Sequence, residues 1–267
     1  MSIVFKYRYL ISRRVVQVTL LLLFFGANFW GWSFLRGNLS AAHIADTFYL
    51  ADPFAAIQML FAGMLLSTDI IIGGLIIFLF YALIAGRSFC SWVCPLNMVA
   101  DFAHWVRAQL PFKPTQRLKI DRKARYWILA LSLIVSLVIG VAAFEYVSPI
   151  GILHRGIIYG FGMGIMAIII IFIFDTLILK HGWCGHLCPL GAFYSLTTKK
   201  SLLRIYHNKD NCTNCLDCKI VCPELQVLDI IGKTSGIISY GACTNCARCI
   251  EVCPDNALKF QFKIKTK

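Results

Sequence analysis

Twelve cysteines hold most of the chemistry available to this chain, and all of them fall in short runs that end in Cys-Pro. Near the C-terminus, a Cys-x2-Cys-x2-Cys-x3-Cys-Pro run occurs twice, at 212–223 and at 243–254. Three thiolates at this spacing can hold three irons of one cubane, and the fourth, ahead of a proline, reaches the neighbouring cubane. The runs therefore predict two [4Fe-4S] clusters, one held by Cys212, Cys215, Cys218 and Cys253, the other by Cys243, Cys246, Cys249 and Cys222.

Zinc is the alternative occupant of these runs, because Cys-x2-Cys pairs also bind zinc. Two complete four-cysteine runs, each followed by a proline, favour the cubane. Cysteines gathered in such motifs also indicate metal ligation in a reducing compartment rather than a disulfide framework.

The other four cysteines form two Cys-x3-Cys-Pro motifs, which repeat only the back half of the longer run. They are Cys90 with Cys94 and Cys184 with Cys188. Three interpretations stay open: a further metal or cluster site, a redox-active or docking feature for the C-terminal domain, and a mainly structural role.

The composition is that of a membrane protein. Of the 267 residues, 58% are hydrophobic and only 15% are charged, and the mean hydropathy is +0.71. The net charge of +13 does not indicate nucleic-acid binding, because the basic residues flank apolar stretches and no separate basic domain remains.

Four apolar stretches are predicted to cross a bilayer, whose core requires about 20 residues of helix. The trio Ser67-Thr68-Asp69 is a good helix N-cap, so Asp69 is interpreted as a capping residue and the apolar residues 53–66 as a separate short helix. The predicted spans are residues 15–35, 70–85, 126–147 and 157–179.

The loops orient these spans in a bacterial inner membrane. The connection from 86 to 125 is rich in basic residues, which the positive-inside rule places in the cytoplasm together with both termini. The first span is interpreted as an uncleaved anchor rather than a signal peptide, and Arg13-Arg14 as positive-inside charge. The basic residues of the connection are Arg87, Arg107, Lys113, Arg117, Lys119, Arg122, Lys123 and Arg125.

The membrane part contains an internal repeat. Each half enters its second span after an X-Pro turn, Asp52-Pro53 or Ser148-Pro149, and ends in Cys-x3-Cys-Pro. Even numbers of spans per half imply parallel repeats. The predicted fold is mostly α: a four-helix membrane module of two parallel two-span repeats (1–200), then a small α+β two-cluster ferredoxin-like domain (201–267) with short strands at 236–240 and 257–260.

At Gly86–Pro95, the Cys184–Pro189 motif and the two long cysteine runs, the chain resembles the NapH-type ferredoxin-type membrane proteins of periplasmic nitrate reductase systems. This resemblance covers nearly the whole chain. It implies a quinol dehydrogenase component that passes electrons toward nitrate reductase. The implied partners are a NapG-type periplasmic ferredoxin, a NapC-type cytochrome and the nitrate reductase complex.

Relatives linked to nitrous oxide reductase, methylamine utilisation and cytochrome oxidase assembly share the same core. They suggest an alternative function, in which the protein donates electrons for assembly or reactivation of a metalloenzyme.

Quinol oxidation requires an apolar pocket with a proton acceptor. The predicted periplasmic ends of the repeats offer His154 or Glu145 for this role, beside Asp52, Gln58 and Arg155. The alternative is that these are turn and solvated loop residues. No transmembrane haem is expected, because the histidines fall at or beyond the span ends: His43, His104, His154, His181, His186 and His207.

Overall fold

The computed structural model describes residues 7–32, 34–45, 47–111, 120–160, 162 and 164–263. Lys113, Arg117 and Lys119 of the basic connection lie outside these ranges. The chain forms two compact units, which are described separately. The C-terminal unit comprises Met1–Gln17, Phe80–Val93 and Tyr194–Lys267, and the helical unit comprises Val18–Leu79 and Cys94–Phe193.

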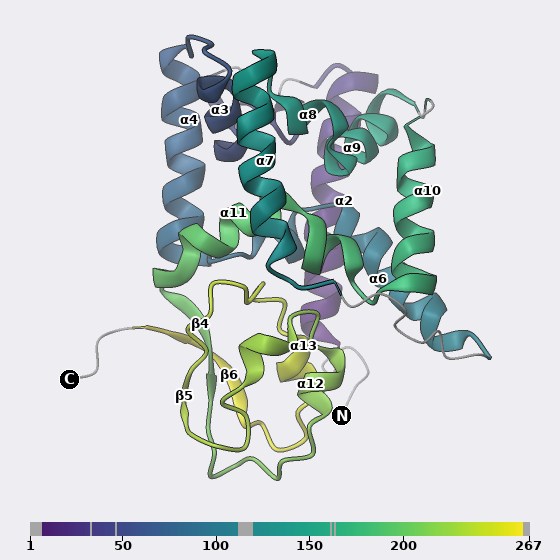
Figure 1. Ribbon diagram of the computed structural model, residues 1–267, viewed down its shortest axis with the longest axis vertical. Helices are drawn as coiled ribbons and strands as arrows, with labels where there is room; N and C mark the ends of the chain where they lie inside the picture. Colours follow the sequence, from purple (N-terminus) through teal and green to yellow (C-terminus); the bar gives the residue numbers. More distant parts are fainter. Residues whose placement is uncertain are drawn as a thin grey trace. The chain divides into compact units, whose positions relative to one another are not determined.

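Four long apolar helices follow one another along the chain (Figure 1). The first is α2 (Arg8–Phe29). The second is α4 (Thr68–Leu79), which continues as the π-helical segment η1 (Phe80–Ala85). The third is α7 (Ala124–Ile139). The fourth is α10 (Ile165–Ile173), which continues as the π-helical segment η2 (Phe174–Ile178).

By length and composition, two of these helices could cross a membrane, Arg8–Phe29 and Thr68–Ala85. The other two, Ala124–Ile139 and Ile165–Ile178, are apolar but shorter. The prediction that the third span continues to Val147 is wrong, because Gly140 ends α7 in the left-handed conformation (φ 72°). The mostly helical fold is confirmed, and the four-span arrangement stays a prediction.

The outward faces of the long helices of the helical unit are apolar. Side chains such as Ile72, Leu75, Leu131, Ile134 and Ile170 are exposed. Apolar surfaces of this kind are unfavourable in contact with water, whereas lipid tails would cover them favourably.

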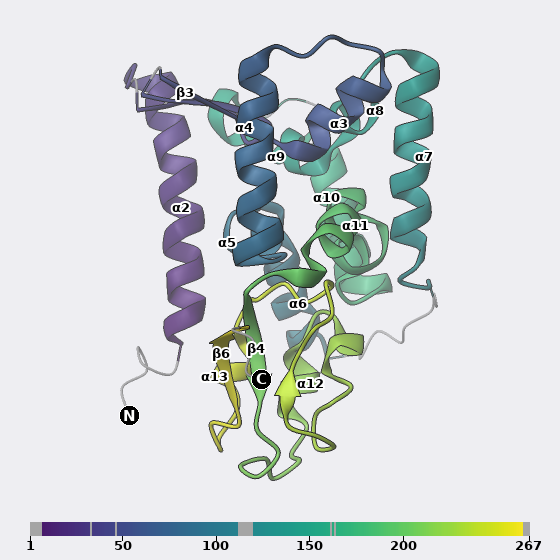
Figure 2. The same cartoon turned by 90° about the vertical axis from the view of Figure 1, so that its left-hand side faces the viewer.

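Short helices gather at one end of α4 and α7 (Figures 1 and 2). These helices are α3 (Pro53–Phe61), α8 (Ala143–Val147) and α9 (Pro149–Tyr159). Asp52 Oδ2 accepts a hydrogen bond from Ala55 N (3.2 Å), and Ser148 Oγ accepts one from Gly151 N (3.4 Å). These caps confirm the predicted X-Pro helix starts, although α3 ends at Phe61 rather than Leu66.

An antiparallel sheet that the sequence analysis did not predict lies between α2 and α3 in the chain. Its strands follow in the order β1 (Leu35–Gly37), β2 (Ala41–Ile44) and β3 (Phe48–Ala51), with Leu35 opposite Ile44 and Ala41 opposite Ala51. β3 packs on α4. A Cβ at Gly73 would collide with the Tyr49 carbonyl oxygen, so this glycine permits the close approach.

Further helices carry or follow the Cys-x3-Cys-Pro motifs along the chain. They are α5 (Phe89–Trp92), α6 (Leu96–Gln109), the π-helical η3 (Trp183–Leu187), α11 (Pro189–Thr197) and the 3-10 turn η4 (Thr198–Lys200). Within the helical unit, α6 packs against η2 and α7 against η3.

The C-terminal unit is built on a second antiparallel sheet of order β5-β4-β6. β5 (Gly236–Ile237) and β6 (Leu258–Phe262) confirm the two predicted strands, whereas the central strand β4 (Leu203–His207) was not predicted. Short helices α12 (Asp217–Val221) and α13 (Arg248–Glu251) and the 3-10 turn η5 (Leu225–Leu228) complete it. The core includes Ile205, Val227, Leu228, Ile231 and Ile238.

The first turns of α2 belong to the C-terminal unit. The backbone N–H of Leu10 donates to the Glu251 carboxylate (2.8 Å), which satisfies one of the donors that a helix start leaves open. Tyr9 packs edge-on against Phe260, and Gln17 Nε2 donates to Ser91 O (3.3 Å).

Two adjacent glycines of α4 give a matched pair of substitutions. In Gly73→Ala, the new methyl group would meet the β3 backbone, whereas in Gly74→Ala it would meet the Ala56 methyl at 3.8 Å, an ordinary contact. We expect Gly73→Ala to destabilise the protein by about 1 to 3 kcal/mol and Gly74→Ala to be tolerated, since alanine favours helix. Apparent melting temperatures in detergent measure both. Equal melting temperatures would contradict this packing of β3 on α4.

Candidate functional site

The eight cysteines of the long runs line two separate cavities in the C-terminal unit. Cys212, Cys215, Cys218 and Cys253 line the first cavity. Cys222, Cys243, Cys246 and Cys249 line the second. These are the two sets of four that the spacing predicts, and all eight are thiols rather than disulfides.

The backbone of both cysteine loops has the same uncommon conformation. Asn214 and Leu216 have positive φ in the first loop (60° and 66°), as do Asn245 and Ala247 in the second (50° and 61°). A left-handed residue with a side chain costs of order 1 kcal/mol or more. Alternating left- and right-handed residues turn successive N–H groups toward one point, which suits an anion.

The buried thiols favour their neutral form as they stand. Burial raises the pKa of Cys243 to about 11, although the cations of Arg204 and Arg87 oppose this shift. Burial also raises the pKa of Cys218, Cys222 and Cys249. Thiolate ligation therefore requires the positive charge of bound iron, which is the normal role of a metal at a cysteine site.

The donor set suits a cubane better than a single ion. In the described part of the chain, no three His, Cys, Asp or Glu side chains converge as one metal ion needs. A [4Fe-4S] cluster takes one cysteine on each of four irons, so its ligands stand farther apart than those of tetrahedral zinc. The two cavities of four cysteines fit that requirement.

The two cavities differ in burial. In the first, Cys215 is exposed, and Cys212 and Cys253 are half-buried. In the second, Cys243, Cys246 and Cys249 are all buried. The first site therefore lies nearer the surface of the C-terminal unit, and the second lies in its interior.

Residues just before the first Cys-Pro hold the second cysteine loop. Ser91 Oγ donates to Thr244 O (2.7 Å), and Trp92 Nε1 donates to Asn245 O (3.0 Å). In return, Asn245 Nδ2 donates to Ala85 O (3.0 Å). The segment around Cys90 is therefore part of the support of the second cavity.

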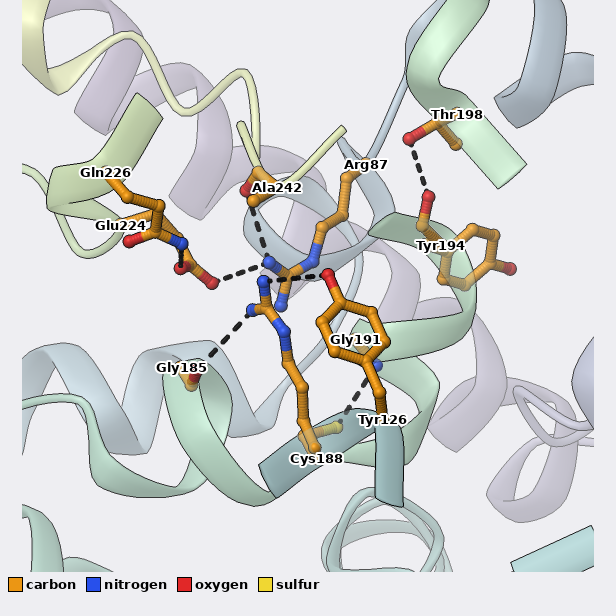
Figure 3. Close-up of polar contacts among 11 residues, drawn as sticks. Arg87, Tyr126, Gly185, Cys188, Gly191, Tyr194, Thr198, Glu224, Gln226 and Ala242 are labelled. Carbon is orange, nitrogen blue, oxygen red and sulfur yellow. Dashed lines mark hydrogen bonds and ion pairs between the residues drawn. The ribbon is translucent and has the colours of Figure 1, made fainter. Parts of the chain in front are cut away.

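A buried ion pair joins the segment before Cys90 to the residues that follow the first long cysteine run (Figure 3). The Arg87 NH1 group donates to Glu224 Oε1 at 2.7 Å and to Ala242 O at 3.2 Å. Gln226 Nε2 donates to the other carboxylate oxygen (2.6 Å). Glu224 also lines the second cysteine cavity. The sequence analysis assigned Arg87 only to the basic connection and to the resemblance, and it did not identify Glu224.

The four cysteines of the Cys-x3-Cys-Pro motifs are divided between the units. Cys90 lies in α5 of the C-terminal unit, whereas Cys94, Cys184 and Cys188 belong to the helical unit. Cys188 Sγ accepts a hydrogen bond from Gly191 N (3.4 Å) at the start of α11. The contacts of Ser91 and Trp92 favour the docking interpretation for the first motif.

A mostly apolar cavity of about 550 Å³ lies in the helical unit, where α3, α8 and strands β2 and β3 meet. Its volume lies within the usual range for small-molecule sites, roughly 300 to 1,000 Å³. Its lining includes Ile70 at the start of α4 and Val141 after the end of α7. The basic connection 86–125 joins the end of η1 to the start of α7. The cavity therefore lies at the opposite ends of these helices, next to the start of α4 and the end of α7.

Three charged residues line this cavity, namely Asp52, Glu145 and Arg155. The Glu145 carboxylate accepts a hydrogen bond from Ser40 Oγ (2.5 Å) and lies 3.8 Å from the Arg155 guanidinium. Burial raises the pKa of Glu145, while Ser40 and Arg155 act against that shift.

Two other residues suggested by the sequence lie outside the cavity lining. His154 is 1% exposed and packs edge-on against Phe24, with 4.8 Å between ring centres. Burial and the nearby Arg155 lower the pKa of His154 to about 4. Gln58 is buried, and its Oε1 accepts from Phe144 N (2.9 Å), so it holds α8 in place.

Sequence comparisons agree with the two kinds of cysteine motif. A family of "4Fe-4S binding domain" proteins matches residues 66–113 and again residues 159–205, one match in each half of the predicted repeat. A "4Fe-4S dicluster domain" family matches residues 204–254. No solved structure matches the chain.

The similar proteins include ferredoxin-type proteins of two named kinds. The chain is 44% identical to "Ferredoxin-type protein NapH" of Haemophilus influenzae over 222 residues, which is 83% of this chain and 77% of that protein. The NapH protein of Escherichia coli is 38% identical over 84% of this chain and 77% of its own length. The chain belongs to the NapH-type ferredoxin-type proteins. The "Methylamine utilization ferredoxin-type protein MauN" of Methylorubrum extorquens is also similar, with 39% identity over 84% of this chain and 78% of its own.

Membership of this family, with the matches to iron-sulfur domains, establishes an iron-sulfur protein of electron transport. The two long apolar helices are consistent with membrane association.

The ion pair between Arg87 and Glu224 gives a test of how the second cavity is held. We expect Arg87→Met or Glu224→Met alone to cost about 3 to 5 kcal/mol, because each leaves a buried charge without its counter-charge. The double variant should be closer to wild type than either single variant. Apparent melting temperature and bound iron per protein measure the effect. Additive losses in the double variant would show that the two charges do not depend on each other.

Proposed function

We propose that this protein oxidises quinol in the bacterial inner membrane. It would pass the electrons, with a NapG-type periplasmic iron-sulfur partner and a NapC-type cytochrome, toward periplasmic nitrate reductase. The observation that carries the electron-transfer part is the division of eight cysteines into two cavities of four. The nitrate reductase and the partners come from the resemblance to the NapH-type proteins.

The cysteine sets have a relay role in this proposal. Cys212, Cys215, Cys218 and Cys253 would hold one [4Fe-4S] cluster, and Cys222, Cys243, Cys246 and Cys249 the other. When bound, such a cluster supplies one-electron transfer without bond chemistry. The half-buried first set suits exchange with a partner, and the interior second set suits storage away from water.

The proposed topology has four spans with both termini in the cytoplasm. It is supported by the contact of the α2 start with Glu251, which requires the N-terminus and the cysteine domain to be on the same side. The connection between α4 and α7 is rich in basic residues, and the positive-inside rule would place it, with this side of the protein, in the cytoplasm. The Glu145 cavity, at the other helix ends, is then at the periplasmic side.

This cavity is our proposed quinol site. Its apolar lining would hold the quinone ring and tail, and Arg155 and Asp52 would orient the ring hydroxyls. Oxidation of one quinol releases two electrons and two protons. The Glu145 carboxylate would take one proton from a hydroxyl and the second would pass to water. The two electrons would be accepted one at a time by iron-sulfur carriers, each of which takes one electron. His154 is the weaker candidate for this role because it lies outside the lining.

Anaerobic redox titration of the purified protein tests the electron-transfer part. We expect about eight irons per protein, as two cubanes require, and EPR signals that a short-chain quinol can produce. Wild-type protein with no iron would remove the cluster assignment. Full clusters that stay oxidised with quinol would leave the relay in place and remove quinol as the donor.

The quinol site is tested by Glu145→Gln, with His154→Gln as the comparison. We expect the glutamine at 145 to slow quinol-dependent reduction by 10²-fold or more, the usual contribution of a positioned base. His154→Gln should have a smaller effect.

The pH dependence has a defined sign. The base is the carboxylate, and burial raises its pKa. The wild-type rate should therefore rise with pH as Glu145 loses its proton, at a pH above its ordinary pKa of about 4.3. Glu145→Gln should lose this limb of the profile. An unchanged rate and an unchanged profile would exclude Glu145 as the acceptor.

The similarity to MauN favours a second candidate, the donation of electrons for assembly or reactivation of a metalloenzyme. The two functions require different reduction potentials of the clusters. Clusters with potentials near the quinone couple favour quinol oxidation, whereas clusters far below that couple favour a low-potential donor.

A further inference from the structure

Arg204 is a buried cation without a carboxylate partner among the described side chains. It lies in the central strand β4 and is 1% exposed. Its NH1 group donates to Tyr240 O (3.0 Å) and its NH2 group to Thr198 O. Both acceptors are neutral carbonyls. Among the residues that the structure describes, no carboxylate forms an ion pair with Arg204, and its Nε–H has no acceptor.

A lone buried charge is costly. Removing a guanidinium from water requires an anion in return, and proteins that bury such a charge pair it or place it beside a bound ion. This requirement contrasts with Arg87 of the same unit, which has Glu224 at 2.7 Å. The anion that neutralises the charge of Arg204 is therefore expected to be a bound group.

The position of Arg204 identifies that group. The carbonyl oxygen of Tyr240 accepts from Arg204 NH1 and also from the backbone N–H of Cys243 (3.1 Å). The guanidinium thus lies directly against the start of the second cysteine loop.

We infer that Arg204 is the counter-charge of the cluster held by Cys222, Cys243, Cys246 and Cys249, and that it raises the reduction potential of that cluster alone. This inference rests on the cluster assignment of the proposed function. Neighbouring residues of a strand point to opposite faces, and Ile205 lines the cavity. Arg204 is therefore a positioning residue that acts across the loop backbone, and it is not a ligand.

The electrostatic consequence follows from charge balance. Four thiolates around a [4Fe-4S] core form an anion, and each electron that arrives from the donor adds one negative charge without making or breaking a bond. A fixed cation in a poorly polarisable interior stabilises the reduced state more than the oxidised state. The lining of the first cavity includes His207 and Asp255 and no arginine. The lining of the second includes Arg248 and Glu224, so Arg204 acts from behind the loop in addition to these charged groups of the cavity itself.

The test is an EPR-monitored redox titration of the full-length holoprotein in detergent, with dithionite as the reductant. Arg204→Met removes the charge and keeps a long side chain. Arg204→Lys keeps the charge. Lys259→Met is the matched control, because it removes one cation from the exposed face of the neighbouring strand β6.

We expect two midpoint potentials in the wild type. In Arg204→Met, one of them should fall by about 59 mV or more, which is a tenfold weaker one-electron reduction, while the other stays constant. Arg204→Lys should recover most of the shift, and Lys259→Met should change neither potential. Two unchanged potentials in Arg204→Met, or an equal fall of both, would overturn the inference.

If Arg204→Met loses the second cluster, Arg204→Lys shows whether the lost charge or the lost shape of the side chain is the cause. Wild-type iron content and potential in Arg204→Lys would show that the charge is what matters. Loss of iron in Arg204→Lys as well would show that the shape of the arginine holds the fold, and the counter-charge role would be rejected. Wild-type protein with fewer than about eight irons would instead disprove the cluster assignment, whatever the variants do.

Discussion

Thiolates that lie side by side in a dry interior repel one another, and the C-terminal unit is arranged around that constraint. Burial raises the pKa of its inner thiols, so thiolate ligation there requires the positive charge of bound iron. Left-handed residues recur at matching positions of both loops, a backbone pattern that can form an anion-binding nest. Around the inner loop stand the Arg87–Glu224 pair and the unpaired Arg204. Arg87 and Arg204 thus both contact backbone carbonyls next to the same loop of cysteines.

This unit is drawn from three separate parts of the chain. The sequence around Arg87, Ser91 and Trp92 sits between apolar stretches, yet its side chains hold the loop of Thr244 and Asn245. The redox domain is therefore not an independent module attached to a membrane part. Its inner site includes residues that membrane topology alone would classify as a connecting loop.

Spacing in the sequence predicted what depends on local chemistry. The positions of eight cysteines and two prolines were enough for the two sets of four, and Asp52-Pro53 and Ser148-Pro149 were enough for two helix starts. What depends on contacts between distant segments was not predictable in this way. Nothing local marks Arg204 or Glu224 as partners of a cysteine loop. The end of α7 at Gly140 was missed because apolar residues continue beyond it. The repeated Thr-Asn before Cys215 and Cys246 was a usable signal for Asn245.

The hydrogen bond from Leu10 to Glu251 has a consequence for biosynthesis. The two residues are 241 positions apart, so the start of the first helix leaves the ribosome long before its partner exists. At 5 to 20 residues per second, the delay is on the order of tens of seconds. During that interval, the helix start lacks the carboxylate that satisfies its Leu10 N–H. The first turns of α2 can take their place in the C-terminal unit only after the segment with Glu251 has been made, so this unit cannot be completed while the chain is still growing toward residue 251.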